Sequence, residues 1–177
     1  TAKLYPDAEN EGYYTLTISG TGNMKLMLNG AVTLGTEDGA NVEIHSLVGD
    51  ENIYIFGMTA NEVDDLWLSG YNSALFYARN DKLRRIVDRL NAGFAGESFS
   101  DIAMYLLSGN GIADPYMCMA DYQSYLATQH EMSNLYATDK RLWNQKSLRN
   151  IAAAGYFAAD RSIREYGENS WNLKALR

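Results

Sequence analysis

A lysine set among apolar residues constrains the fold of this chain more than any other feature. Lys25 lies in residues 19–36, SGTGNMKLMLNGAVTLGT, with Met and Leu on both sides of it. A helix through this segment would be apolar nearly all round, and such helices are buried. Burial disfavours the charged ammonium and favours the neutral amine, which attacks carbonyls. We therefore expect Lys25 to be buried and nucleophilic, although by pattern alone a lone lysine at a helix start is more often a surface residue.

Two glycines lie shortly before this lysine. Gly20 and Gly22 flank Thr21 at the expected start of the same helix. Glycine lets the backbone approach a ligand closely, and the free N–H groups of a helix start attract an anion. From Gly22 to Lys25 the helix rises only about 4.5 Å, at 1.5 Å per residue. One small ligand with a phosphate and an aldehyde could contact both features, and pyridoxal phosphate is such a ligand.

Composition excludes some classes of partner. The chain has 177 residues, a net charge of −7 and one cysteine, Cys118. An acidic chain is a poor match for nucleic acid or an anionic membrane, because both are polyanions. A single cysteine cannot pair within the chain, which suits a reducing cytoplasm. The sequence has no run of about 18 apolar residues, so no membrane span is predicted. We expect a cytoplasmic protein of one domain or a large part of one.

The apolar pattern of the first third predicts an α/β fold. Residues 1–12 are polar and are expected to form a loop or frayed leader. Strands are predicted near residues 13–18, 31–35 and 52–57, with helices between them. Such a βαβαβ order implies parallel strands with right-handed crossovers, as in Rossmann-like sheets. Residues 13–57 are therefore the expected cofactor-binding portion.

From residue 58 onward the pattern becomes helical. Asn80 is expected to cap a helix that ends at Gly93, because Leu83, Ile86, Val87 and Leu90 recur at helical spacing. Asp121 is expected to cap a later helix, and either Thr138 or Asp139 the next one. Residues 58–177 are predicted to be the helical portion of the same domain, which the resemblance described below implies is C-terminal.

Several segments together resemble a known family. Residues 19–25, SGTGNMK, are similar to the cofactor segment of the α-glucan (glycogen, starch and maltodextrin) phosphorylases. The resemblance continues at segments spread over the rest of the chain: residues 27–31, 39–43, 55–58, 120–125, 149–152 and 160–163. Family members are several times longer, so the resemblance implies the C-terminal fifth of a two-domain enzyme with a glycosyltransferase-B-like fold. The parent is expected to be a homodimer.

The resemblance also implies a reaction and its residues. The family releases glucose 1-phosphate from the ends of α-1,4-glucans with orthophosphate, using pyridoxal 5'-phosphate. Lys25 would hold this cofactor as a Schiff base, while Thr21 and Gly22 would bind its phosphate. Ser19 and Gly20 would bind hydroxyls of the terminal glucose. The family has an acidic residue two places before the matching serine, whereas this chain has Thr17, which cannot supply a charged acceptor.

Two other classes of protein stay open from the sequence. A binding module would use Lys25 only as a counter-ion for phosphate, and a packing fragment would expose apolar patches. His45 and His130 have no evident pattern of carboxylates or cysteines around them, so structural roles are expected and no metal site is predicted. Cys118 lies between two methionines and is expected to be buried. The isolated chain is expected to be inactive.

Overall fold

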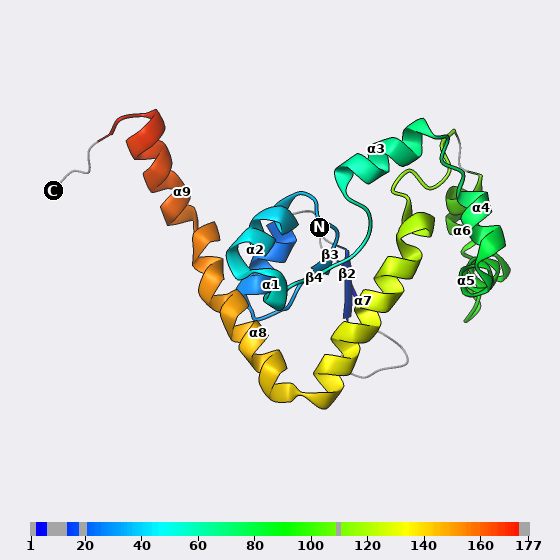
Figure 1. Ribbon diagram of the computed structural model, residues 1–177, viewed down its shortest axis with the longest axis horizontal. Helices are drawn as coiled ribbons and strands as arrows, with labels where there is room; N and C mark the ends of the chain where they lie inside the picture. Colours follow the sequence, from blue (N-terminus) through cyan, green and yellow to red (C-terminus); the bar gives the residue numbers. More distant parts are fainter. Residues whose placement is uncertain (1–2, 7–13, 18–20, 109–110, 174–177) are drawn as a thin grey trace. The chain divides into compact units, whose positions relative to one another are not determined.

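The computed structural model describes residues 3–6, 14–17, 21–108 and 111–173. The chain divides into two compact units, drawn in Figure 1. The first unit combines Thr1–Tyr54 with Met132–Arg177, and the second is Ile55–Glu131. The second unit is therefore continuous in sequence, whereas the first is assembled from two distant segments.

The strands differ from the predicted three-stranded arrangement. β2 (Tyr14–Thr17) pairs antiparallel with β1 (Lys3–Pro6), whose residues were expected in a loop. A separate parallel pair consists of β3 (Leu34–Gly35) and β4 (Tyr54–Ile55). The prediction that the strand of residues 13–18 is parallel to the other two is thus wrong, because the backbone of β2 pairs with β1 instead. Only the crossover from β3 to β4 keeps the predicted βαβ form.

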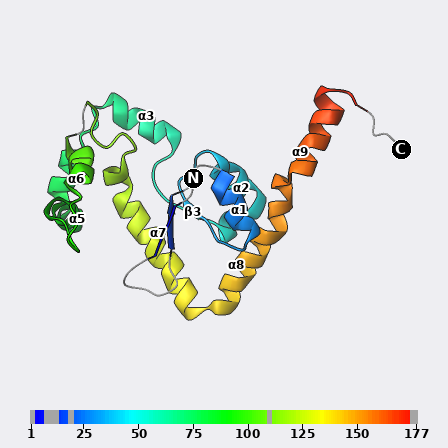
Figure 2. The same ribbon diagram turned by 180° about the vertical axis from the view of Figure 1, so that it is seen from behind.

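The other elements described in the first unit are helical. The N-terminal segment contains α1 (Thr21–Leu28), α2 (Ala40–Val48) and the 3-10 turn η1 (Asp50–Asn52). The C-terminal segment contains the following elements: α8 (Lys140–Ala153), the 3-10 turn η2 (Ala154–Phe157), α9 (Ala159–Glu165) and the π-helical turn η3 (Tyr166–Ser170). α1 and α2 lie beside α8 in both Figure 1 and Figure 2.

The second unit is helical, as the pattern predicted. It contains α3 (Ala60–Leu68), α4 (Ser73–Arg79), α5 (Asp81–Ala92), α6 (Ser100–Leu107) and the first part of α7 (Cys118–Thr138). Its core gathers buried side chains of α5, α6 and α7, namely Leu83, Val87, Ala103 and Met119. The helical spacing of α5 places Leu83 and Val87 on one face, which explains their burial.

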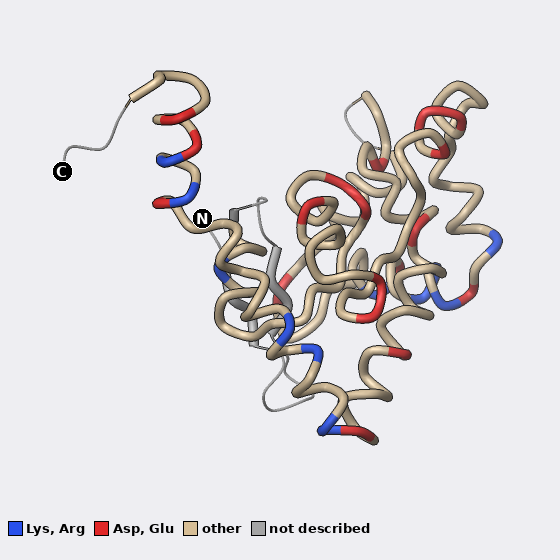
Figure 3. Tube along the Cα trace, turned by 60° about the vertical axis from the view of Figure 1, so that its left-hand side comes forward, with Lys and Arg blue, Asp and Glu red and all other residues tan. Residues whose placement is uncertain are grey.

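Charged residues and hydropathy were compared along the described part of the chain. Figure 3 shows Lys and Arg interspersed with Asp and Glu along the described trace. In the described part of the chain, no helix combines the length and the apolar character that crossing a membrane requires.

Candidate functional site

The predicted cofactor helix is present as α1. It begins at Thr21, so Gly22 lies in its first turn and Lys25 one turn further on. The first N–H groups of any helix have no partner within it, and α1 has no acidic residue in its first turn to compete for an anion. Ser19 and Gly20, the predicted glucose contacts, lie outside the described residues.

The burial of α1 is one-sided, which corrects the prediction that this helix is buried nearly all round. Met27 is fully buried, but Leu28 is 59% exposed and Lys25 is exposed as well. α1 packs on α2, α8 and η2, and its opposite face is exposed among the residues that the structure describes. The prediction that Lys25 is buried is therefore wrong.

The Lys25 amine is accessible to a ligand. No hydrogen bond or ion pair holds its Nζ among the residues that the structure describes. The backbone of the same residue is fixed, because Asn29 Nδ2 donates to the Lys25 carbonyl at 2.7 Å. An accessible amine on a fixed helix, one turn after free N–H groups, fits a ligand that carries both an aldehyde and a phosphate.

The C-terminal end of α1 is held by α8. Ser147 Oγ donates to the Gly30 carbonyl at 2.7 Å across 117 positions of sequence. Gly30 has φ +85°, and a Cβ there would lie 2.7 Å from Ser147 Oγ. Only glycine combines this backbone conformation with such a close approach. The position of Lys25 therefore depends on a helix more than a hundred residues away.

The N-terminal part of α1 is joined to α2 by two asparagines. Asn23 Nδ2 donates to Asn41 Oδ1 at 2.6 Å, and Asn41 Nδ2 donates to the Thr36 carbonyl at 3.0 Å. Asn41 is buried, and a Cβ at Gly35 would lie 2.5 Å from its Nδ2. Because a buried amide is costly unless it is hydrogen-bonded, this pair fixes the spacing of α1 and α2. Neither asparagine was predicted to have a role, although both lie within the segments that resemble the family.

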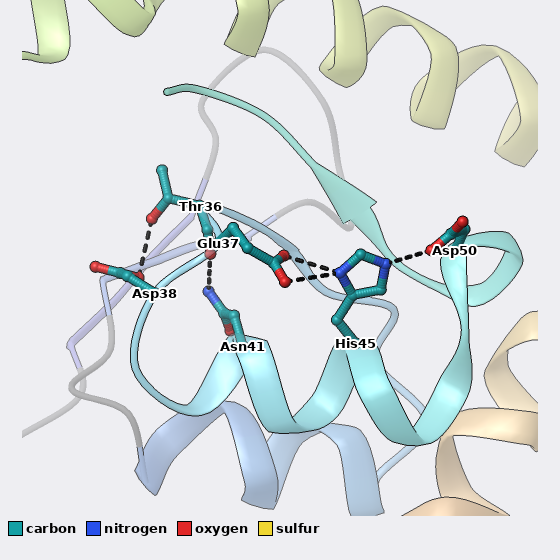
Figure 4. A network of polar contacts seen from close by, with 6 residues as sticks. All are labelled: Thr36, Glu37, Asp38, Asn41, His45 and Asp50. Carbon is teal, nitrogen blue, oxygen red and sulfur yellow. Dashed lines mark hydrogen bonds and ion pairs between the residues drawn. The ribbon is translucent and has the colours of Figure 1, made fainter. Parts of the chain in front are cut away.

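The surroundings of His45 also differ from the prediction. It was expected to lack carboxylates nearby, but its Nδ1 lies 2.8 Å from Glu37 Oε2 and its Nε2 lies 2.6 Å from Asp50 Oδ1 (Figure 4). The hydrogen bond to Glu37, and then that to Asp50, raise the pKa of His45 above its usual value. The spacings of eight and five residues match no short helical pattern, so the sequence offered no signal. The cluster joins the loop before α2 to the turn after it.

Other candidate groups are arranged differently from the predictions. Cys118 is exposed at the start of α7, whereas burial was expected. Among the described residues, no group of three or more His, Cys, Asp and Glu side chains could hold a metal ion.

Comparisons with known proteins relate the chain to one family. The family model described as carbohydrate phosphorylase matches residues 11–173. The chain is 42% identical to the brain form of glycogen phosphorylase from Mus musculus over 160 residues, 88% of this chain and 18% of that protein. It is 42% identical over 156 residues to the liver form from Homo sapiens, with 88% and 18% covered. It is 40% identical over 158 residues to glycogen phosphorylase from Synechocystis sp., with 89% and 18% covered. The chain thus spans less than a fifth of the length of these relatives.

Proposed function

This chain belongs to the carbohydrate phosphorylase family, and from that premise we propose that it is the C-terminal part of an α-glucan phosphorylase that carries the pyridoxal phosphate lysine. The observation that supports this most directly is the accessible Lys25 amine, one turn after the start of α1. In the parent, the reaction is phosphorolysis of terminal α-1,4 bonds by orthophosphate. The parent is proposed to be a cytoplasmic homodimer.

The residues of α1 take separate roles in this proposal. Lys25 holds the cofactor covalently, and the first-turn N–H groups at Thr21 and Gly22 hold its phosphate. Ser19 and Gly20 bind the terminal glucose. When bound, the cofactor supplies a phosphate group that exchanges a proton with the substrate phosphate. The Asn23–Asn41 hydrogen bond and the Ser147 contact keep the helix start and the amine in register.

The isolated chain is proposed to lack phosphorylase activity. Two phosphates held close together require cationic groups to offset their repulsion. Residues 19–39 contain one cation, Lys25, and the proposal already assigns it to the aldehyde. The remaining phosphate and sugar ligands must therefore come from parts of the parent outside this chain.

The test is phosphate-dependent labelling of Lys25. The 177-residue chain is incubated with pyridoxal phosphate or with pyridoxal, reduced with borohydride and mapped by peptide mass spectrometry. Lys25 should be labelled several-fold more by pyridoxal phosphate, because the N–H groups of α1 recruit the phosphate. Lys146, in the middle of α8 and away from any helix start, is the reference for unselective labelling. Gly22→Val should remove the preference at Lys25 by crowding the phosphate.

Three outcomes separate the alternatives. Equal labelling of Lys25 by both aldehydes, or a preference shared by Lys146, would refute the cofactor assignment. Protection of the α1 amides by inorganic phosphate without selective labelling would favour a phosphate-binding module. Lys25→Arg should abolish labelling at this position, because a guanidinium stays protonated and cannot condense with an aldehyde.

Exposed apolar side chains favour a further role in packing within the parent. Large apolar residues are exposed on several helices, among them Leu68 at 87%, Leu148 at 64% and Ile163 at 59%. Exposed apolar surface of this kind marks contact sites or self-association. We propose that absent parts of the parent cover these residues. Static light scattering should show the isolated chain associating with itself, and a strictly monomeric chain at high concentration would contradict this proposal.

A further inference from the structure

A cavity of about 540 Å³ lies within the second unit. Residues of α3, α4, α5 and α7 line it, and none of them belongs to the predicted cofactor site. Its volume falls in the range of about 300–1,000 Å³ that is typical of small-molecule sites. Most of the wall is apolar or aromatic and comprises Leu66, Tyr71, Leu75, Phe76, Leu83 and Met119.

Two asparagines in the wall of the cavity present donors. Asn72 Oδ1 accepts from the Ala74 N–H at 3.0 Å, and Asn80 Oδ1 accepts from the Leu83 N–H at 3.1 Å. These capping bonds use the carbonyl oxygen of each amide, so each NH₂ group remains free to donate to a ligand. Both asparagines line the cavity.

The charge of the cavity is positive. Arg79 is the one charged residue among the described side chains that line it, and no ion pair or hydrogen bond holds its guanidinium within the described chain. The nearest carboxylate in sequence, Asp81, is paired with Arg84 at 2.6 Å. Asp114 accepts a hydrogen bond from the Tyr71 hydroxyl at 2.7 Å and two more from backbone N–H groups at the start of α7. Both acids are thus compensated, whereas Arg79 is not.

The aromatic wall adds a preference for flat molecules. The Tyr71 and Phe76 rings lie 5.6 Å apart and are tilted by 46° to each other. Aromatic rings gain from offset or edge contacts with a further ring at such distances. A guanidinium binds a planar carboxylate through two parallel hydrogen bonds.

We propose that this cavity binds a small ligand with a flat apolar ring and a single carboxylate. The ring contacts the wall that Tyr71 and Phe76 provide, and the carboxylate pairs with Arg79. The free NH₂ groups of Asn72 and Asn80 are further donors to the carboxylate. This inference does not depend on the proposed phosphorylase function, because it uses only residues 66–123.

The experiment compares two probes of the same shape on the full chain. 2-Naphthoate carries the carboxylate, and 2-naphthamide is its neutral counterpart. By isothermal titration calorimetry, 2-naphthoate should bind at one site and at least tenfold more tightly than 2-naphthamide. Amide shifts in NMR spectra should be confined to residues that line the cavity.

Variants assign the binding to its parts. Arg79→Gln should weaken 2-naphthoate about tenfold and leave 2-naphthamide unchanged. Leu75→Ser should weaken both probes alike, since Leu75 lines the apolar wall and is half exposed, so the fold tolerates the change. Arg141→Gln removes an equal charge from an exposed position outside the cavity and should change nothing.

Three binding results and one spectroscopic result would each overturn the proposal. The binding results are equal affinity of the two probes for the unmodified chain, an undiminished affinity of Arg79→Gln for 2-naphthoate, and an equal loss in Arg141→Gln. NMR shifts outside the cavity would likewise contradict it.

Discussion

Replacing Gly30 by alanine tests how α1 is held. Gly30 has φ +85°, and a Cβ there meets Ser147 Oγ at 2.7 Å and Ile151 Cδ1 at 3.3 Å. A left-handed backbone costs an L-residue about 1–2 kcal/mol, and overpacking adds about 1–3 kcal/mol. We expect Gly30→Ala to destabilise the contact of α1 with α8 by about 2–5 kcal/mol, the sum of these two effects.

Two companion variants separate the two effects. Gly70 has nearly the same φ, +86°, but nothing lies within 4 Å of a Cβ there, so Gly70→Ala should show the backbone cost alone. Ser147→Ala removes the crowding atom and one hydrogen bond, for a loss of about 0.5–1.5 kcal/mol. The stability lost in the double variant of Gly30 and Ser147 should be smaller than the sum of the losses in the two single variants, by about 1–3 kcal/mol.

Hydrogen exchange followed by mass spectrometry is the suitable assay, because it reports local opening free energies in each unit separately. Peptides from α1 and α8 report on Gly30→Ala, and peptides from α3 and α4 report on Gly70→Ala. Strict additivity of Gly30→Ala and Ser147→Ala, or equal losses at Gly30 and Gly70, would refute the reasoning. Phosphate-dependent labelling of Lys25 should fall in Gly30→Ala and recover in the double variant.

Three further predictions concern a core residue, a histidine and a thiol. Met27→Ala should destabilise the first unit by about 2–5 kcal/mol in hydrogen exchange, since Met27 is fully buried, while Leu28→Ala should have little effect. Because its two carboxylate partners raise the pKa of His45, the histidine stabilises the fold fully below pH 6.5, and this stability is lost as pH rises through the raised value. In urea unfolding, the free energy of unfolding of the native chain should therefore exceed that of His45→Gln at pH 6, and this difference should disappear at high pH. A difference that does not depend on pH would contradict this prediction. Partial desolvation, with a contribution from Asp114, raises the pKa of the exposed Cys118 thiol to about 11, so alkylation by iodoacetamide should stay slow at pH 8 and accelerate toward pH 11.

Local features of the helices could be predicted from the sequence. Asn80 caps α5 and Gly93 ends it, and Asp139 caps α8, all as expected. These signals are local, because a capping side chain bonds N–H groups two or three residues away. Asp121 was expected to cap a helix, but it lies inside α7 and accepts from the Met58 N–H at 3.0 Å. That bond spans 63 residues, and no local pattern encodes it.

Strand pairing and burial were the parts that the sequence could not supply. A short β-branched run predicts a strand but not its partner, so β2 was placed with the wrong neighbours. The helix α4 was missed, because its seven residues lie between a turn and the cap at Asn80. The motif around Lys25 predicted the helix correctly, but the apolar residues on both sides suggested more burial than α2 and α8 provide.

The contact between Ser147 of α8 and Gly30, which follows α1, also determines when the first unit can finish folding during translation. Ser147 follows Gly30 by 117 residues, which take about 6–23 s to synthesise at 5–20 residues per second. The second unit, Ile55–Glu131, is continuous and helical, so all of its residues are synthesised before the ribosome reaches α8. During that interval α2 can already pack on α1, but the part of α1 that α8 and η2 cover in the finished structure is open to chaperones or to aggregation. Slower translation over residues 55–131 would therefore lengthen the period in which this part of α1 is exposed.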